Sequence, residues 1–106
     1  MKYLYLFRQT GTNDYKIGVS KHPDKRILEL NVGNPQKMEL IFQFETSVPY
    51  KLEKALHKFF SSMRYENSEW FLFNELDLEN FKEKCFALDQ KITYLKDNNT
   101  FCYNFS

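Results

Sequence analysis

The sequence contains little of what marks disordered, disulfide-rich or membrane-spanning chains. Its 106 residues include three glycines and three prolines, too few for a flexible, low-complexity chain. Cys85 and Cys102 are the only cysteines, and since they show no regular spacing we expect free thiols in a reducing compartment. No apolar run approaches the roughly 18 residues that span a bilayer, and no secretion signal follows Lys2. We therefore expect one cytoplasmic domain (nuclear in a eukaryotic host) that is neither secreted nor membrane-bound.

An excess of one charge is also lacking, because the formal net charge is +1 at pH 7. The distribution is nevertheless uneven. Residues 1–65 hold eleven Lys or Arg and six Asp or Glu, whereas residues 66–106 hold four and eight. A basic front half can indicate an anionic ligand such as nucleic acid. Charge blocks of this size also arise by chance, so the charges alone leave both interpretations open.

Alternating side chains near the N-terminus predict a β-hairpin. Residues 3–8 place Tyr5 on one face and leucines on the other. Residues 15–19 form the second expected strand, with Lys16 on the face opposite Ile17. The polar stretch QTGTND between them supplies turn residues. Tyr5 and Lys16 can therefore share one face of a sheet if the register allows it.

Helices and strands are expected to alternate over the middle of the chain. A helix should begin at Pro23 and stop at Gly33. Residues 38–46 alternate as a strand, and a second helix should start at Pro49. The apolar stripe expected on this second helix consists of Leu52, Leu56, Phe59, Phe60 and Met63.

The last third of the sequence predicts one long helix. Residues 69–73, EWFLF, form a short strand or an extended segment before it. Asp77 is expected to cap the helix, which runs through Ile92, and residues 93–106 form a short strand or a docked tail. The expected inward side of the helix is Leu78, Phe81, Cys85, Leu88 and Ile92. The whole order predicts an α+β fold: a small central antiparallel sheet of about three strands, flanked by helices, with an extra C-terminal helix.

Five polar residues on these elements can act together. Tyr5 and Lys16 lie on the hairpin, and Arg26 lies on the helix that follows. Glu53 and His57 are four residues apart on the second helix, so they stand on one face. Each residue alone is typical of an ordinary structural role, such as a half-buried strand tyrosine or an exposed helical pair. Two candidate ligands also fall short of the four that a zinc site prefers.

Taken together, five short stretches resemble the GIY-YIG nuclease superfamily. They are YLYLF, YKIG, an arginine eight residues after Gly18, LEKALH and EWF, in that order. The sequence is most similar to the phage and viral branch, whose second motif reads KIG. The resemblance runs from Lys2 to about Phe73, roughly two-thirds of the chain. It implies a nuclease core over residues 1–73, with residues 74–106 forming a C-terminal helix and tail packed on the same domain.

The resemblance also implies roles for individual residues. Tyr5 matches the tyrosine of the first motif, and Lys16 stands where the classical second tyrosine would be. Arg26 matches the family's arginine, and His57 matches a histidine common in this branch. Glu53 matches the glutamate that binds a single divalent metal, Mg²⁺ or Mn²⁺. A polar residue often closes the family's site, and the nearest candidates here are Asn67, Glu69 and Trp70. The glycine and isoleucine of the first motif are replaced by Tyr3 and Leu4.

These roles imply a metal-dependent endonuclease that hydrolyses phosphodiester bonds in DNA. One Mg²⁺ on Glu53 would polarise the phosphate, since Mg²⁺ often takes a single protein carboxylate. Arg26 offers a planar fork to phosphate oxygens. Tyr5 is expected to relay a proton, with its pKa lowered by the positive charge of Lys16. The four side chains of Tyr5, Lys16, Arg26 and Glu53 should then converge within roughly 10–12 Å.

Binding to DNA is expected to depend on phosphate contacts. The basic residues expected to make them are Lys21, His22, Lys25, Lys54 and Lys58. An alternative remains open: a catalytically inactive nucleic-acid-binding or protein-interaction module with the same fold. A third interpretation is a subunit whose specificity comes from a partner.

Overall fold

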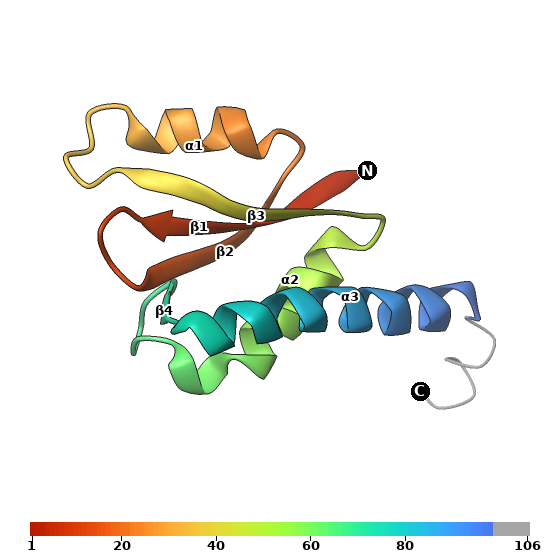
Figure 1. The fold of residues 1–106 in the computed structure, drawn as a ribbon. Helices are drawn as coiled ribbons and strands as arrows, with labels where there is room; N and C mark the ends of the chain where they lie inside the picture. Colours follow the sequence, from red (N-terminus) through yellow and green to blue (C-terminus); the bar gives the residue numbers. More distant parts are fainter. Residues whose placement is uncertain (99–106) are drawn as a thin grey trace.

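The computed structural model describes residues 1–98 and confirms the expected α+β fold (Figure 1). The hairpin is formed by β1 (Lys2–Gln9) and β2 (Asp14–Ser20). The remaining elements are α1 (Pro23–Asn31), β3 (Met38–Thr46), α2 (Pro49–Phe59), the short 3₁₀ helix η1 (Ser61–Met63), β4 (Trp70–Leu72) and α3 (Glu75–Asp97). None of the described helices is both long and apolar enough to cross a membrane.

The sheet has four antiparallel strands in the order β3-β1-β2-β4. The fourth strand is the EWFLF segment, which pairs with β2. This pairing is short, because β4 reaches only residues 14–16 of β2. Within the described part of the chain, residues 17–20 therefore have no strand beside them on the side away from β1. This stretch is called the free edge of β2 below.

Alternation along β1 divides the interior into two apolar clusters. Tyr5, Phe7 and Met38 lie on the face that α1 covers, and Ile27 and Leu30 of that helix pack against them. The leucines of β1 face the other way, into a larger cluster that α2 and α3 cover. Figure 1 shows the two layers, with α1 on one side of the sheet and α2 and α3 on the other.

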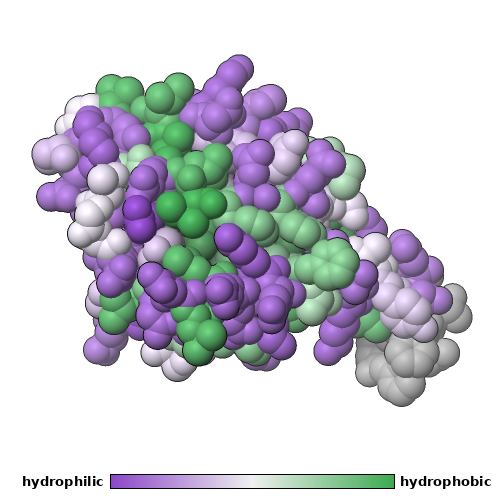
Figure 2. Space-filling model, in the orientation of Figure 1, coloured by the Kyte–Doolittle hydropathy of each residue, from purple (hydrophilic) through white to green (hydrophobic). Residues whose placement is uncertain are grey.

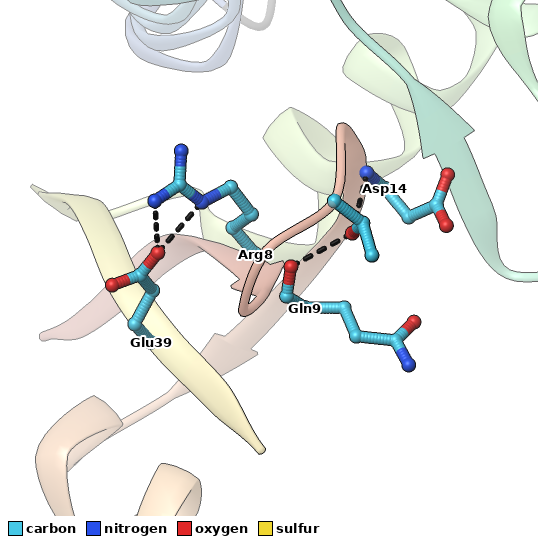
Figure 3. A network of polar contacts seen from close by, with 5 residues as sticks. Arg8, Gln9, Asp14 and Glu39 are labelled. Carbon is cyan, nitrogen blue, oxygen red and sulfur yellow. Dashed lines mark hydrogen bonds and ion pairs between the residues drawn. The ribbon is translucent and has the colours of Figure 1, made fainter. Parts of the chain in front are cut away.

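Polar contacts fix the hairpin at its turn (Figure 3). The Thr12 hydroxyl donates to the Gln9 carbonyl at 2.7 Å and accepts from the Asp14 backbone N–H at 3.1 Å. Arg8 and Glu39 lie opposite each other on β1 and β3, and Arg8 Nε donates to Glu39 Oε1 at 2.6 Å. These contacts hold the register of β1 between its two neighbours.

The C-terminal helix begins earlier and ends later than the sequence predicted. Asn74 is the N-cap, and Asp77 is the third helical residue: Asn74 Oδ1 accepts from the Asp77 N–H at 2.8 Å, and Asp77 Oδ2 accepts from the Asn74 N–H at 2.9 Å. The expected cap at Asp77 was therefore wrong by one turn. Residues 93–97 are helical rather than a strand or tail, and residues 99–106, including Cys102, lie outside the described residues.

The helices bury the predicted residues with one exception. Phe81 and Cys85 of α3 are fully buried, and Leu78, Leu88 and Ile92 pack on the same cluster. On α2, Phe59 was expected inside but is 47% exposed, and Lys84 Nζ lies 4.5 Å from its ring centre. Phe60, which was also expected inside, is fully buried. In the orientation of Figure 1, apolar side chains gather in the middle of the surface between hydrophilic margins (Figure 2).

Candidate active site

The free edge of β2 is where α2 approaches the sheet with polar side chains. His57 Nε2 lies 3.3 Å from the carbonyl oxygen of Ile17, and its ring meets Phe71 edge-on at 5.2 Å. A carbonyl oxygen can only accept, so Nε2 must carry the proton of this hydrogen bond. Nδ1 is then the free acceptor of a neutral His57 ring.

Tyr5 reaches β2 from the opposite face of the sheet. It is paired with Gly18, and a Cβ added at Gly18 would stand 2.3 Å from both Cζ and the hydroxyl oxygen of Tyr5. The tyrosine ring therefore lies directly on the glycine backbone, where any larger residue would displace it. Phe7 stacks on the same ring with centroids 3.8 Å apart, so the orientation of the phenol is fixed.

Charged side chains from α1, from α2 and from the loop before β4 act on the Tyr5 hydroxyl. Burial raises the pKa of Tyr5, and the nearby guanidinium of Arg26 opposes that rise. The carboxylates of Glu53 and Glu69 raise the pKa of Tyr5 further. The net effect is a pKa above the ordinary value of 10.0, so the expected lowering of this pKa was wrong. The phenol is protonated at neutral pH.

Glu53 is a partly buried carboxylate on α2. It forms no hydrogen bond or salt bridge with residues 1–98. Desolvation raises the pKa of Glu53, and only the charge of His57 opposes this. A bound cation would stabilise the ionised form of such a desolvated carboxylate. Mg²⁺ can be held by a single protein carboxylate because it keeps several of its waters. Within residues 1–98 no group of three or more His, Cys, Asp or Glu is arranged to bind a metal, so Glu53 is a single candidate ligand.

Lys16 is engaged with Glu69 rather than with Tyr5. Its Nζ lies 3.0 Å from Glu69 Oε1, and it is not among the charges that shift the pKa of Tyr5. The expectation that Lys16 tunes Tyr5 was therefore wrong, and Arg26 takes that place. The reason is the pairing of Lys16 with Trp70 across β2 and β4, which sets Glu69 beside the lysine.

The charges of Arg26, Glu53 and Glu69 thus all act on the Tyr5 hydroxyl, while His57 acts on Glu53 and Lys16 pairs with Glu69. Of the three candidates for the closing residue, only Glu69 acts on the Tyr5 hydroxyl. Trp70 packs against the apolar cluster under α1, and Asn67 occupies a left-handed turn with φ of 56°. The predicted phosphate-binding residues Lys21, His22, Lys25, Lys54 and Lys58 are all exposed, around α1 and along α2.

Comparison with known proteins gives one match. A family profile described as the T5orf172 domain matches residues 2–86, from β1 into α3. No curated protein and no solved structure matches the chain significantly. The profile covers every element that contributes to the free edge of β2.

Proposed function

The chain belongs to the T5orf172 domain family, a GIY-YIG-like, phage-associated endonuclease-type domain, and we propose that it is a metal-dependent endonuclease that cleaves DNA. One observation carries the proposal. Arg26 of α1 and Glu53 of α2 both act electrostatically on the hydroxyl of Tyr5, whose ring lies on Gly18 at the free edge of β2. Such a group of a phenol, a guanidinium and an unpaired carboxylate supplies what phosphodiester hydrolysis requires.

Glu53 is the proposed ligand of Mg²⁺ or Mn²⁺. Once bound there, the ion would act as a Lewis acid toward the phosphate and the leaving oxygen. The Arg26 side chain is 45% exposed, and its guanidinium lies 3.6 Å from the exposed carboxylate of Glu29 one helical turn later. An exposed pair of this kind contributes little free energy, so a phosphate can replace Glu29 as the partner of Arg26. Its planar fork would bind two phosphate oxygens and stabilise the negative charge that grows during attack.

Tyr5 and His57 are the proposed groups for proton handling. Because Tyr5 stays protonated, its hydroxyl can donate a hydrogen bond to the phosphate or orient the attacking water. The proton that leaves the water needs an acceptor. Nδ1 of His57 is the free acceptor on this edge when Nε2 donates to Ile17.

A second function is favoured by two observations, namely the raised pKa of Tyr5 and the locked position of Lys16. Both suit a nucleic-acid-binding or protein-interaction module that keeps the fold without cleavage. The two functions differ in a single measurable respect, which is turnover of a phosphodiester substrate.

A plasmid-nicking assay with Mg²⁺ or Mn²⁺ tests the proposal. The parent should convert supercoiled plasmid to nicked or linear forms, whereas Glu53→Ala should cut at least about a hundredfold more slowly and still bind DNA. Arg26→Ala should lose cleavage and also bind more weakly, since it loses a phosphate contact. The matched controls are Glu83→Ala and Lys91→Ala, two exposed charges on α3 that should leave cleavage unchanged. A folded parent that binds DNA and RNA but cuts neither would establish the module instead.

A further inference from the structure

The ion pair between Lys16 and Glu69 is unequal in its burial. The Lys16 side chain is only 15% exposed, whereas that of Glu69 is 62% exposed. Lys16 lies opposite Phe7 of β1 on one side and opposite Trp70 of β4 on the other, so its stem is enclosed within the sheet face. The lysine is therefore held in place, and the glutamate is the partner that can move.

Glu69 places an anion among the cations of the candidate site. Its Oε1 accepts a hydrogen bond from Lys16 Nζ, and its charge acts on the hydroxyl of Tyr5, as the charge of Arg26 also does. A carboxylate oxygen and a phosphate oxygen are both acceptors for an ammonium group. The position of Glu69 is thus one that the chemistry of the site would also offer to a phosphate.

We propose that Glu69 occupies a phosphate-binding position, and that nucleic acid exchanges the Lys16–Glu69 pair for a pair between Lys16 and a backbone phosphate. The inference rests on the proposed function, because it assigns a contact within the same site. The exchange is feasible since an exposed ion pair contributes little net free energy and a largely exposed carboxylate is readily rehydrated. Lys16, which is mostly buried, regains an anionic partner in the phosphate.

The first test compares Glu69→Gln with Glu66→Gln. Glu66 is exposed, lies three residues earlier in the same loop and forms no ion pair with residues 1–98, so the two changes remove the same charge from the same region. Binding is measured by fluorescence anisotropy with a short labelled DNA duplex in EDTA, which separates binding from metal and cleavage. Glu69→Gln should tighten binding about threefold to tenfold, and Glu66→Gln should do so much less.

Salt dependence gives a readout that a merely structural role would not change. Under the exchange, Lys16 neutralises one backbone phosphate in the complexes of both the parent and Glu69→Gln. Glu69→Gln should therefore bind more tightly with the same slope of log K against log salt as the parent, whereas Lys16→Ala should lower that slope by about 0.9. The Glu66→Gln slope should equal that of the parent.

A double-mutant cycle tests whether the gain depends on Lys16. Glu69→Gln should tighten binding more when Lys16 is present than in the Lys16→Ala background. The reason is that only a protein with both Lys16 and Glu69 must break their ion pair when it binds DNA. Thermal unfolding of each variant checks that the fold persists.

Three outcomes overturn the exchange. They are equal gains from Glu69→Gln and Glu66→Gln, an equal gain with and without Lys16, and weaker binding by Glu69→Gln. If the parent binds DNA and any of these outcomes is seen, the exchange is wrong and the proposed function is unaffected. If the parent binds no DNA even at low salt, both the exchange and the proposed function are wrong.

Discussion

The ring of Tyr5 rests on the backbone of Gly18, its partner across β1 and β2. Only a hydrogen fits at position 18, because a methyl group there would stand 2.3 Å from the phenol. The glycine of the KIG stretch thus has a packing function. It lets a tyrosine from the face under α1 extend over β2 to the edge where α2 presents Glu53 and His57.

Gly18→Ala should therefore destabilise the protein by about 1–3 kcal/mol, the usual cost of overpacking. The backbone gives no reason for this cost, since Gly18 does not have the positive φ of Gly11 and Gly33, and alanine normally stabilises a strand relative to glycine. The free energy of unfolding from urea titration measures the effect. Cleavage should fall as well, because the phenol is displaced.

The Tyr5→Ala background supplies the control for this contact. With the ring removed, Gly18→Ala should become neutral or stabilising, although Tyr5→Ala itself costs stability by leaving a cavity. An undiminished cost of Gly18→Ala in that background would mean that something other than Tyr5 restricts position 18.

Glu53 should destabilise the metal-free fold at neutral pH. The pKa of Glu53 in the folded state is raised above 4.5, so ionising this carboxyl costs more free energy in the folded state than in the unfolded state. Glu53→Gln should accordingly be slightly more stable than the parent at pH 7, by about 0.5 kcal/mol. The advantage should shrink as the pH falls through the raised pKa and vanish below 4.5, where both states of the parent are protonated. Urea titrations of both proteins from about pH 4 to about pH 7, a range that covers the titration of this carboxyl, measure the difference in stability.

Metal should reverse the order of stability. Mg²⁺ or Mn²⁺ that binds the folded parent raises its melting temperature with the logarithm of the metal concentration above Kd, and Glu53→Gln should show no such rise. Glu83→Gln on α3 is the control, and it should respond to metal as the parent does. Equal metal-induced shifts in the parent and Glu53→Gln would remove Glu53 as the ligand.

The sequence was enough to predict the hairpin, the helices and the face shared by Tyr5 and Lys16, because strand alternation and helical spacing are local properties. The site's charges were harder to predict. Whether Lys16 acts on Tyr5 or on Glu69 depends on how far β4 reaches along β2, a contact between residues some fifty positions apart. No local pattern encodes that length.

Two smaller errors have the same origin. Asp77 has the residue type of an N-cap, but Asn74 lies three residues earlier and can cap equally well, and the two form a reciprocal capping box. Phe59 fits the apolar spacing of α2, yet it stands at the margin of the stripe. Its ring is contacted by Lys84 of α3 and is not buried in the core. Packing between elements decided both cases.

Thr46 should be important for joining the sheet to the helices beneath it. Its side chain is buried, its hydroxyl donates to Asp89 of α3, and the same oxygen accepts from the Val48 N–H at 3.0 Å just before α2. Thr46→Val keeps the shape and removes both hydrogen bonds, so it should cost about 1–3 kcal/mol. Thr46→Ser keeps the hydroxyl and loses one methyl group, and should cost about 0.8 kcal/mol. A Thr46→Val protein as stable as Thr46→Ser would show that the hydroxyl contributes nothing.

The exposed basic residues should make DNA binding strongly dependent on salt. Lys25 lies on α1 and Lys58 lies on α2, on two helices that flank the sheet from opposite faces and both contribute to the site. If each contacts one phosphate, Lys25→Gln and Lys58→Gln should each weaken binding and lower the slope of log K against log salt by about 0.9. The control is Lys91→Gln, which removes an exposed lysine from α3 and should leave the slope unchanged. Because all three changes alter net charge equally, a general charge effect predicts the same loss from each. Equal losses, or a slope unaffected by any of them, would show that DNA does not lie across α1 and α2.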